Sequence, residues 1–235
     1  MAQVDEIADG IFRINLAPSG SRVTFSLFLI KGDEPTLVET SFGRVFDEVN
    51  GAVAEVINPK DIRNIVVPHF EADECGGLNH FLGIAPHART LASFTGSSSL
   101  TDFTGREVRS VADGEVLELG RGKRLRILHT PYVHQWDSIL AYEETTKTLF
   151  SSDLFMQPGD GPPIVELDLT DKMIAGYRAS GLMPSMAHLH AALDKIEPLG
   201  VERIACHHGS TIAGKVVPNY FQAIRDNDVT AFGGS

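Results

Sequence analysis

Few cysteines, no excess of positive charge and no long apolar run limit what this chain can be. Its 235 residues include only two cysteines, which is too few for a disulfide scaffold. The formal net charge of −11 would repel nucleic acid and anionic membrane surfaces. No apolar run approaches the ~20 residues of a membrane helix, and the first residues lack the basic and apolar regions of a secretory leader. We therefore expect a cytoplasmic protein that binds neither nucleic acid nor membrane.

Short β-type runs and amphipathic helical stretches occur in mixed order. Strands are predicted at 11–16, 23–30, 36–39, 64–68, 89–93, 107–112, 116–119, 124–130, 138–143, 147–152 and 203–206. Helical periodicity marks 45–57, 186–196 and 217–224. Because hairpin-like strands come first and strand–helix alternation begins only near residue 44, the pattern predicts an α/β fold with two packed sheets and outer helices.

Two segments rich in Gly, Pro and Ser, 93–105 and 156–164, are predicted to be surface loops. Neither has the length of an interdomain linker, and no internal repeat is visible. We therefore expect residues 1–235 to form a single domain.

Residues of the kind that bind metal ions follow the ends of four predicted strands. His69, Asp153 and His208 each come shortly after a strand, and His134 lies in the loop between two others. The stretch VVPHFEADECGGLNHF (66–81) adds three carboxylates directly after His69. The full candidate set is His69, Glu71, Asp73, Glu74, His134, Asp153 and His208, and it has enough donors for two metal ions.

Several neighbouring residues have a structural interpretation beside a functional one. A histidine without companion donors is usually structural, which applies to His80, His87, His188 and His190. His129 and His207 lie within a few residues of candidate ligands, where they would either be structural or hold a ligand or pass a proton. Asp137 is either an acceptor that supports the site or a turn residue.

Glu74 and the two cysteines also leave alternatives open. Glu74 either binds metal or turns outward and caps a helix that begins near Gly76. Cys75 and Cys206 follow and precede candidate ligands, and we expect both to be free thiols near the site that do not bind metal. Cys75 is a further candidate for a supporting role.

The donor types indicate which metal this set would bind. Zinc sites favour His and Cys, whereas carboxylate-rich sites with a few imidazoles suit iron or manganese. The three negative carboxylates of Glu71, Asp73 and Asp153 would leave a pair of ferrous ions with a small net positive charge. A fourth carboxylate, from Glu74, would make the site neutral. We therefore predict two iron ions in a redox site, with zinc or manganese as the alternatives.

The segments HFEADECGG, HQWDSILAYEETTKTLFSSD and ACHHGS together resemble the metallo-β-lactamase fold. Within that fold they resemble the diiron domain of flavodiiron proteins, of the oxygen-binding diiron protein type. The family pattern is H-x-E-x-D-H, then a histidine, an aspartate and a final histidine before glycine. Here His134 follows His69 by 65 residues, Asp153 follows His134 by 19, and His208 precedes Gly209, which are the intervals of that family.

The resemblance implies an αββα sandwich with a two-iron site. It implies that His69, Glu71 and His134 bind one iron, that Asp73 and His208 bind the other, and that Asp153 bridges them. Glu74 stands where the family has a second-site histidine. Flavodiiron proteins continue into a flavodoxin domain that holds FMN, so the expectation is that this chain binds no flavin and takes electrons from another protein.

Three functions remain open at this point. The carboxylate-rich donor set favours a non-haem diiron protein that binds or reduces O2, or a similar diatomic such as NO, as an oxygen sensor or as the reductase half of a two-component system. The second is a dinuclear hydrolase of thioesters, lactones or phosphoesters. A third is a non-catalytic signalling module that reads iron or oxygen. The expected partners are a diatomic, a separate redox or signalling protein and, as an alternative, a second copy of this chain.

Overall fold

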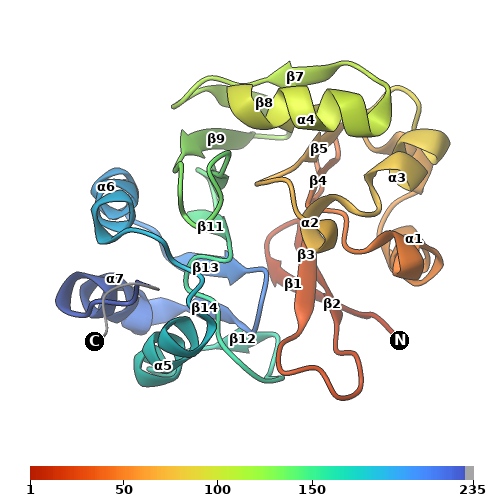
Figure 1. The fold of residues 1–235 in the computed structure, drawn as a ribbon. Helices are drawn as coiled ribbons and strands as arrows, with labels where there is room; N and C mark the ends of the chain where they lie inside the picture. The colour runs from red at the N-terminus through yellow and green to blue at the C-terminus, as the bar shows by residue number, and fades with distance from the viewer. Residues whose placement is uncertain (231–235) are drawn as a thin grey trace.

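The computed structural model describes residues 1–230 as two seven-stranded sheets packed face to face, with helices on both outer faces (Figure 1). The first sheet has the order β1 (Gln3–Ala8), β2 (Ile11–Leu16), β3 (Phe25–Ile30), β4 (Thr36–Val38), β5 (Asn64–Val66), β6 (Arg89–Ala92) and β7 (Val108–Ser110). The second has the order β12 (Ile164–Val165), β14 (Thr211–Ala213), β13 (Arg203–Cys206), β11 (Thr148–Ser152), β10 (Ile139–Glu143), β9 (Lys123–His129) and β8 (Val116–Gly120). Both sheets mix parallel and antiparallel pairs, as predicted for an α/β sandwich.

The helices divide between the two outer faces. The first sheet is covered by α1 (Phe46–Ala54), α3 (Leu78–Ile84) and α4 (Phe94–Thr104), and the second by α5 (Thr170–Ser180), α6 (Met186–Ile196) and α7 (Val217–Asp226). A short helix, α2 (Ala72–Cys75), lies at one edge of the sandwich (Figure 1). None of the helices in the described part of the chain combines the length and apolar composition that a bilayer crossing needs.

Buried apolar residues form three clusters, one for each interface between layers. In β3, Phe28 and Ile30 face the second sheet, whereas Leu27 and Leu29 face the helices on the outside. Because successive side chains point to opposite faces and both faces are buried, such a strand reads as a continuous apolar run. This arrangement confirms the predicted αββα sandwich.

The prediction of a surface loop at 93–105 is wrong, because α4 occupies most of it. The Ser93 hydroxyl accepts a hydrogen bond from the Gly96 amide at 3.0 Å and begins the helix, and Gly105 ends it with φ +64°. The Ser and Gly content of this segment favours a loop, although Ser93 and Gly105 are in fact the two helix caps. The patterns above also do not predict β1, β14 or α5.

Glu143, at the end of β10, closes the turn into β11 from inside the protein. Its fully buried carboxylate accepts hydrogen bonds from the amides of Thr145 and Thr146, at 3.1 and 2.8 Å, and from the Thr146 hydroxyl. Burial acts to raise the pKa of Glu143, but these hydrogen bonds outweigh it and hold the pKa below its usual value. The ionised carboxylate therefore stabilises the folded state.

We expect Glu143→Gln to lower the free energy of unfolding by about 1–3 kcal/mol at neutral pH, because the amide NH2 would face N–H and O–H donors. A carboxylate with a depressed pKa in the folded state stabilises the protein above its unfolded-state pKa, and this contribution is lost as pH falls through the folded-state value. The difference from the natural protein should therefore shrink as the solution is acidified. Urea unfolding at several pH values measures it.

Glu202→Gln is the matched control, because Glu202 forms an exposed ion pair with Lys147 at 2.7 Å. Exposed pairs of this kind contribute little to stability. An equal loss of stability in both variants would contradict the role given to Glu143.

Candidate metal centre

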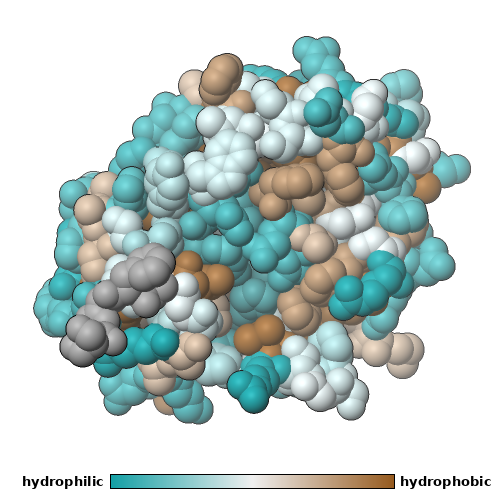
Figure 2. All heavy atoms as spheres, in the orientation of Figure 1, coloured by the Kyte–Doolittle hydropathy of each residue, from teal (hydrophilic) through white to brown (hydrophobic). Residues whose placement is uncertain are grey.

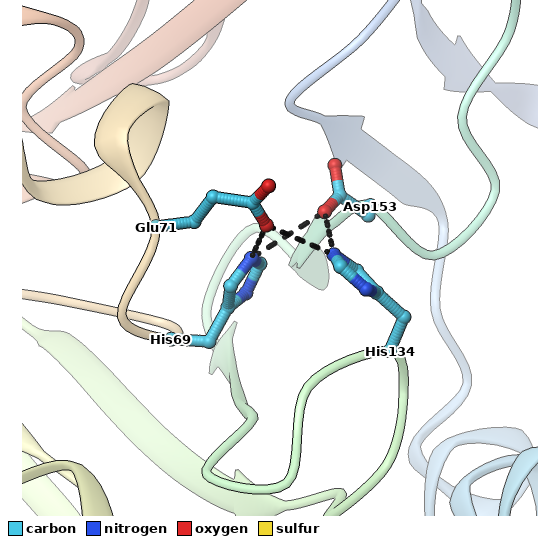
Figure 3. Close-up of side chains that lie close together, drawn as sticks. All are labelled: His69, Glu71, His134 and Asp153. Carbon is cyan, nitrogen blue, oxygen red and sulfur yellow. Dashed lines mark hydrogen bonds and ion pairs between the residues drawn. The ribbon is translucent and has the colours of Figure 1, made fainter. Parts of the chain in front are cut away.

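Donor atoms from separate strand ends converge at the edge of the sandwich. His69, Glu71, His134 and Asp153 each offer a ligand atom, and these atoms lie within 4.8 Å of one another. His134 Nε2 is 2.9 Å from Asp153 Oδ2 and 3.2 Å from Glu71 Oε2, and His69 Nε2 is 3.3 Å from the same Glu71 atom. Figure 3 shows all four side chains pointing toward one another, His69 and Glu71 from one segment and His134 and Asp153 from two others. We call these four residues the first donor group.

A second donor group consists of Asp73, His207 and His208. Asp73 Oδ2 lies 3.6 Å from His207 Nε2 and 3.9 Å from His208 Nε2. Asp153 links the two groups, because its Oδ2 faces the first group while its Oδ1 lies 3.1 Å from His208 Nε2. The geometry is that of a carboxylate shared between two sites.

Glu74 lies between the two donor groups. Its Oε1 is 3.6 Å from His69 Nε2 and 3.8 Å from His207 Nε2, and its side chain is only 1% exposed. The alternative in which Glu74 turns outward to cap a helix is therefore wrong.

The chain after β5 places the acidic residues by turning sharply. Glu71 is still extended, and α2 begins at the next residue, so Asp73 and Glu74 occupy its first turn. Gly76 and Gly77 allow this helix to approach the loop after β4: an added Cβ at Gly77 would lie 2.5 Å from the Thr40 carbonyl oxygen. The Thr40 amide and hydroxyl donate to the Glu74 carbonyl at 2.7 and 3.0 Å. These contacts hold Glu74 in the interior.

Backbone carbonyl groups orient two of the histidines. His208 Nδ1 lies 2.7 Å from the Thr24 carbonyl oxygen, and His207 Nδ1 lies 2.7 Å from that of Ser26. A carbonyl oxygen only accepts hydrogen bonds, so each Nδ1 carries a proton and donates it. The Nε2 atoms of both rings are thereby turned to the acidic cluster, in the tautomer that binds metal through Nε2.

Buried donor atoms without partners show that this cluster fits a metal. Among residues 1–230, no hydrogen-bond partner exists for either carboxylate oxygen of Glu74, for Asp153 Oδ1 or for Nε2 of His134 and His207. Each such atom costs about 1–3 kcal/mol when left unsatisfied. The donors point to shared space more than to one another, since even His134 Nε2 and Asp153 Oδ2 are close without being aligned for a hydrogen bond. Cations at that space would satisfy them.

The pKa values of the cluster show how strongly its charges interact. Burial acts to lower the pKa of His134, but Asp153 and Glu71 outweigh it and raise the value to about 9. The nearby rings of His134 and His69 hold the pKa of Glu71 well below its usual range. Burial raises the pKa of Glu74 well above its ordinary value. Without a cation, the cluster therefore relies on protons to balance its carboxylates.

The residues predicted to support the metal ligands, Asp137 and Cys75, and the second cysteine, Cys206, have different surroundings. Asp137 Oδ2 accepts from the Phe70 amide at 3.0 Å and so holds the segment that carries His69. The Cys75 thiol donates to the Glu71 carbonyl at 3.0 Å, and burial raises the pKa of this thiol to about 12. Cys206 is also a free, buried thiol with a pKa raised by burial to about 12.

The histidines interpreted as structural lie outside the donor groups. His80 stacks on Phe46, and His188 bonds to Ser185. His129 Nε2 lies 2.9 Å from the Val111 carbonyl oxygen, and this residue too is outside both groups.

One residue that the sequence analysis does not identify is Glu39. It follows β4, is fully buried and contacts His207 Nδ1 through its carboxylate. The sequence does hold one indication of this role, the acidic residue that ends the apolar run TLVE. A buried strand seldom ends in an unpaired carboxylate, so a partner for Glu39 is to be expected.

The cluster is open to solvent on one side. The Glu71 side chain is 43% exposed and that of Asp73 15%, whereas His69 and Asp153 are almost fully buried. Figure 2 shows hydrophilic residues gathered in a hollow in the middle of this face, between α2 and the ends of β11 and β13. A small molecule would reach the donor groups from this side.

Comparison with known proteins places the chain among relatives of the same fold. It is 27% identical over 223 residues to the flavo-diiron protein FprA2 of Clostridium acetobutylicum, covering 87% of this chain and 56% of that protein. It is 31% identical over 194 residues to the putative diflavin flavoprotein A 1 of Thermosynechococcus vestitus, covering 79% of this chain and 34% of that protein. The chain thus spans about half or less of these relatives.

Two solved structures have the same fold at lower identity. The 1–254 fragment of the putative diflavin flavoprotein A 5 from Nostoc sp. PCC 7120 superimposes with a TM-score of 0.87 at 22% identity, covering 96% of this chain and 94% of that fragment. Rubredoxin oxygen:oxidoreductase from Desulfovibrio gigas also superimposes with a TM-score of 0.87 at 22% identity, covering 95% of this chain and 61% of that protein.

The resemblance to flavodiiron proteins is confirmed at the level of family and fold. The model of the family described as "ODP family beta lactamase" matches residues 23–209, which is most of the chain. The chain therefore belongs to the ODP family of β-lactamase-like proteins, with flavodiiron proteins among its relatives.

Proposed function

We propose that this chain is a non-haem diiron protein that binds or reduces dioxygen or a similar diatomic. The observation that carries the proposal is the pair of donor groups sharing Asp153, with buried donor atoms that have no hydrogen-bond partner among residues 1–230. The family relation supports it, because a relative is named a flavo-diiron protein and a structural neighbour an oxygen oxidoreductase. The role is that of an oxygen sensor or of the reducing half of a two-component system.

The residues would divide between two metal ions according to the donor groups. His69, Glu71 and His134 would hold the first ion, and Asp73 and His208 the second. Asp153 would bridge them, because its two oxygens face histidines of different groups. The buried carboxylate of Glu74 would add a further ligand.

When bound, two ferrous ions would supply electrons and open coordination positions for a diatomic. The protein's own part is to hold and orient these ligands. The carboxylates balance the cationic charge and favour the ferric state. Burial of most ligands keeps bulk water to the side of Glu71 and Asp73, which is where a small molecule would enter. Electrons for turnover would come from a separate redox protein. We also propose that residues 1–235 act as one diiron domain.

We predict about two iron ions per chain in protein isolated without oxygen or chelator. Asp153→Ala should remove the shared carboxylate. Binding of both iron ions should then weaken, because each donor group uses this residue. His80→Ala and His188→Ala are the controls, since both histidines lie outside the donor groups. Metal analysis of the four proteins measures the effect.

Uniform iron loss in all three variants would contradict the assignment of the site. About one zinc ion with esterase activity, in protein made with ample iron, would favour the hydrolase alternative instead.

Oxygen reactivity is tested on the chain loaded anaerobically with ferrous iron. Admitting O2 should change the absorption spectrum and consume electrons that can be counted, and Asp153→Ala should abolish both effects.

A second prediction concerns the charge that Glu74 adds. Glu74→His replaces an anionic donor by a neutral one, and anionic ligands stabilise the ferric over the ferrous state. We therefore expect the reduction potential of the iron centre to rise and the oxidised centre to be reduced faster by dithionite. A spectroelectrochemical titration measures the potential. Glu55→His, on the exposed end of α1, is the control; identical potentials in all three proteins would show that Glu74 does not bind the metal.

A further inference from the structure

His207 lies in the second donor group although the motif that indicates the metal ligands does not include it. Its ring is fully buried, and its centroid is 4.5 Å from that of His208 at an interplanar angle of 70°. The two adjacent histidines thus direct their Nε2 atoms to the same acidic cluster. The question is whether His207 binds there or only supports the fold.

The back of the His207 ring is held by two acceptors. Nδ1 lies 2.7 Å from the Ser26 carbonyl oxygen and also contacts the Glu39 carboxylate. The His207 carbonyl in turn accepts from the Ser26 amide at 2.8 Å. A ring held by a carboxylate on one nitrogen presents the other nitrogen in a fixed direction, as metal-binding histidines commonly do.

The free nitrogen has no hydrogen-bonding role among residues 1–230. The nearest acidic atoms are Asp73 Oδ2 at 3.6 Å and Glu74 Oε1 at 3.8 Å, both too distant for a hydrogen bond. Two ligands about 2.1 Å from one ion lie roughly 3–4 Å apart, so these separations suit neighbouring ligands of one metal. If the residue were only half of an ion pair with Glu39, its Nε2 would stay buried and unsatisfied.

We propose that His207 binds the second metal ion through Nε2, and that Glu39 positions the ring from behind. This inference rests on the proposed metal pair. It also accounts for Glu74: the family pattern has an imidazole at that position, and here β13 delivers an imidazole to the same space through His207. The second ion would then have Asp73 and two histidines, in addition to the shared Asp153.

The test is anaerobic titration of the metal-free full chain with Co²⁺, followed by visible absorption and by competition with a chelator. The natural protein should bind two ions. His207→Gln should keep the first and raise the dissociation constant of the second at least tenfold, with a changed visible spectrum. His129→Gln is the matched control, because this ring bonds to the Val111 carbonyl outside the donor groups and its loss should leave both ions bound.

Two further variants separate binding from support of the fold. Glu39→Gln removes the charge behind the ring and should weaken the second site by about 10–100-fold, while the first site keeps its affinity. Glu74→His, added to the His207→Gln chain, should restore second-site affinity, because the two side chains reach the same space. A residue with a purely structural role would not be rescued in this way.

The outcomes distinguish the inference from the proposed function. A natural protein that binds no pair of ions would overturn the proposed function. A natural protein that binds two ions, with the same affinity and spectrum in His207→Gln, would overturn only the inference. Loss of both ions in His207→Gln without rescue by Glu74→His would show that His207 only supports the fold, and would overturn the inference too.

Discussion

The concentration of carboxylates in a largely buried space is the constraint on which the site depends. Glu71, Asp73, Glu74 and Asp153 all direct oxygen atoms into one cluster, and Glu74 and Asp153 are nearly inaccessible to water. Like charges in such a place repel and lose their hydration, so they persist only with compensating cations. Histidines supply part of that compensation. Metal ions would supply the rest, and they would also satisfy the donor atoms that lack hydrogen bonds.

The fold tolerates this cluster because the candidate ligands are attached to rigid elements. They follow β5, β11 and β13 or lie in the β9–β10 loop, and β5, β10 and β11 are buried on both faces. Three apolar clusters hold the layers together and keep the strand ends in place. Ligands placed on strands keep their geometry better than ligands placed on mobile loops. The packing of the sandwich therefore offsets the repulsion between the clustered carboxylates.

Glu74 and His207 together describe how the second site departs from the family pattern. A carboxylate occupies the position of an imidazole on α2, and an imidazole comes from the end of β13 on the other sheet, with 3.8 Å between their donor atoms. If both bind, the site keeps its imidazoles and gains a negative charge. Under the proposed function, that combination would favour the ferric state, which would suit a protein that holds an oxygen-derived signal better than one that turns over rapidly.

The sequence by itself determined the fold class and which potential donor residues stand at the strand ends, because both depend on local patterns. Apolar runs mark the buried strands, and the intervals between His69, His134 and Asp153 match those of a known family. Local composition does not predict the helix α4, because its caps, Ser93 and Gly105, are residue types that are equally common in loops. Only the tertiary structure decided that Glu74 faces inward and that Glu39 lies against His207, which is 168 positions away. Such contacts arise where the two sheets meet, and no local periodicity records which residues will face each other across that distance.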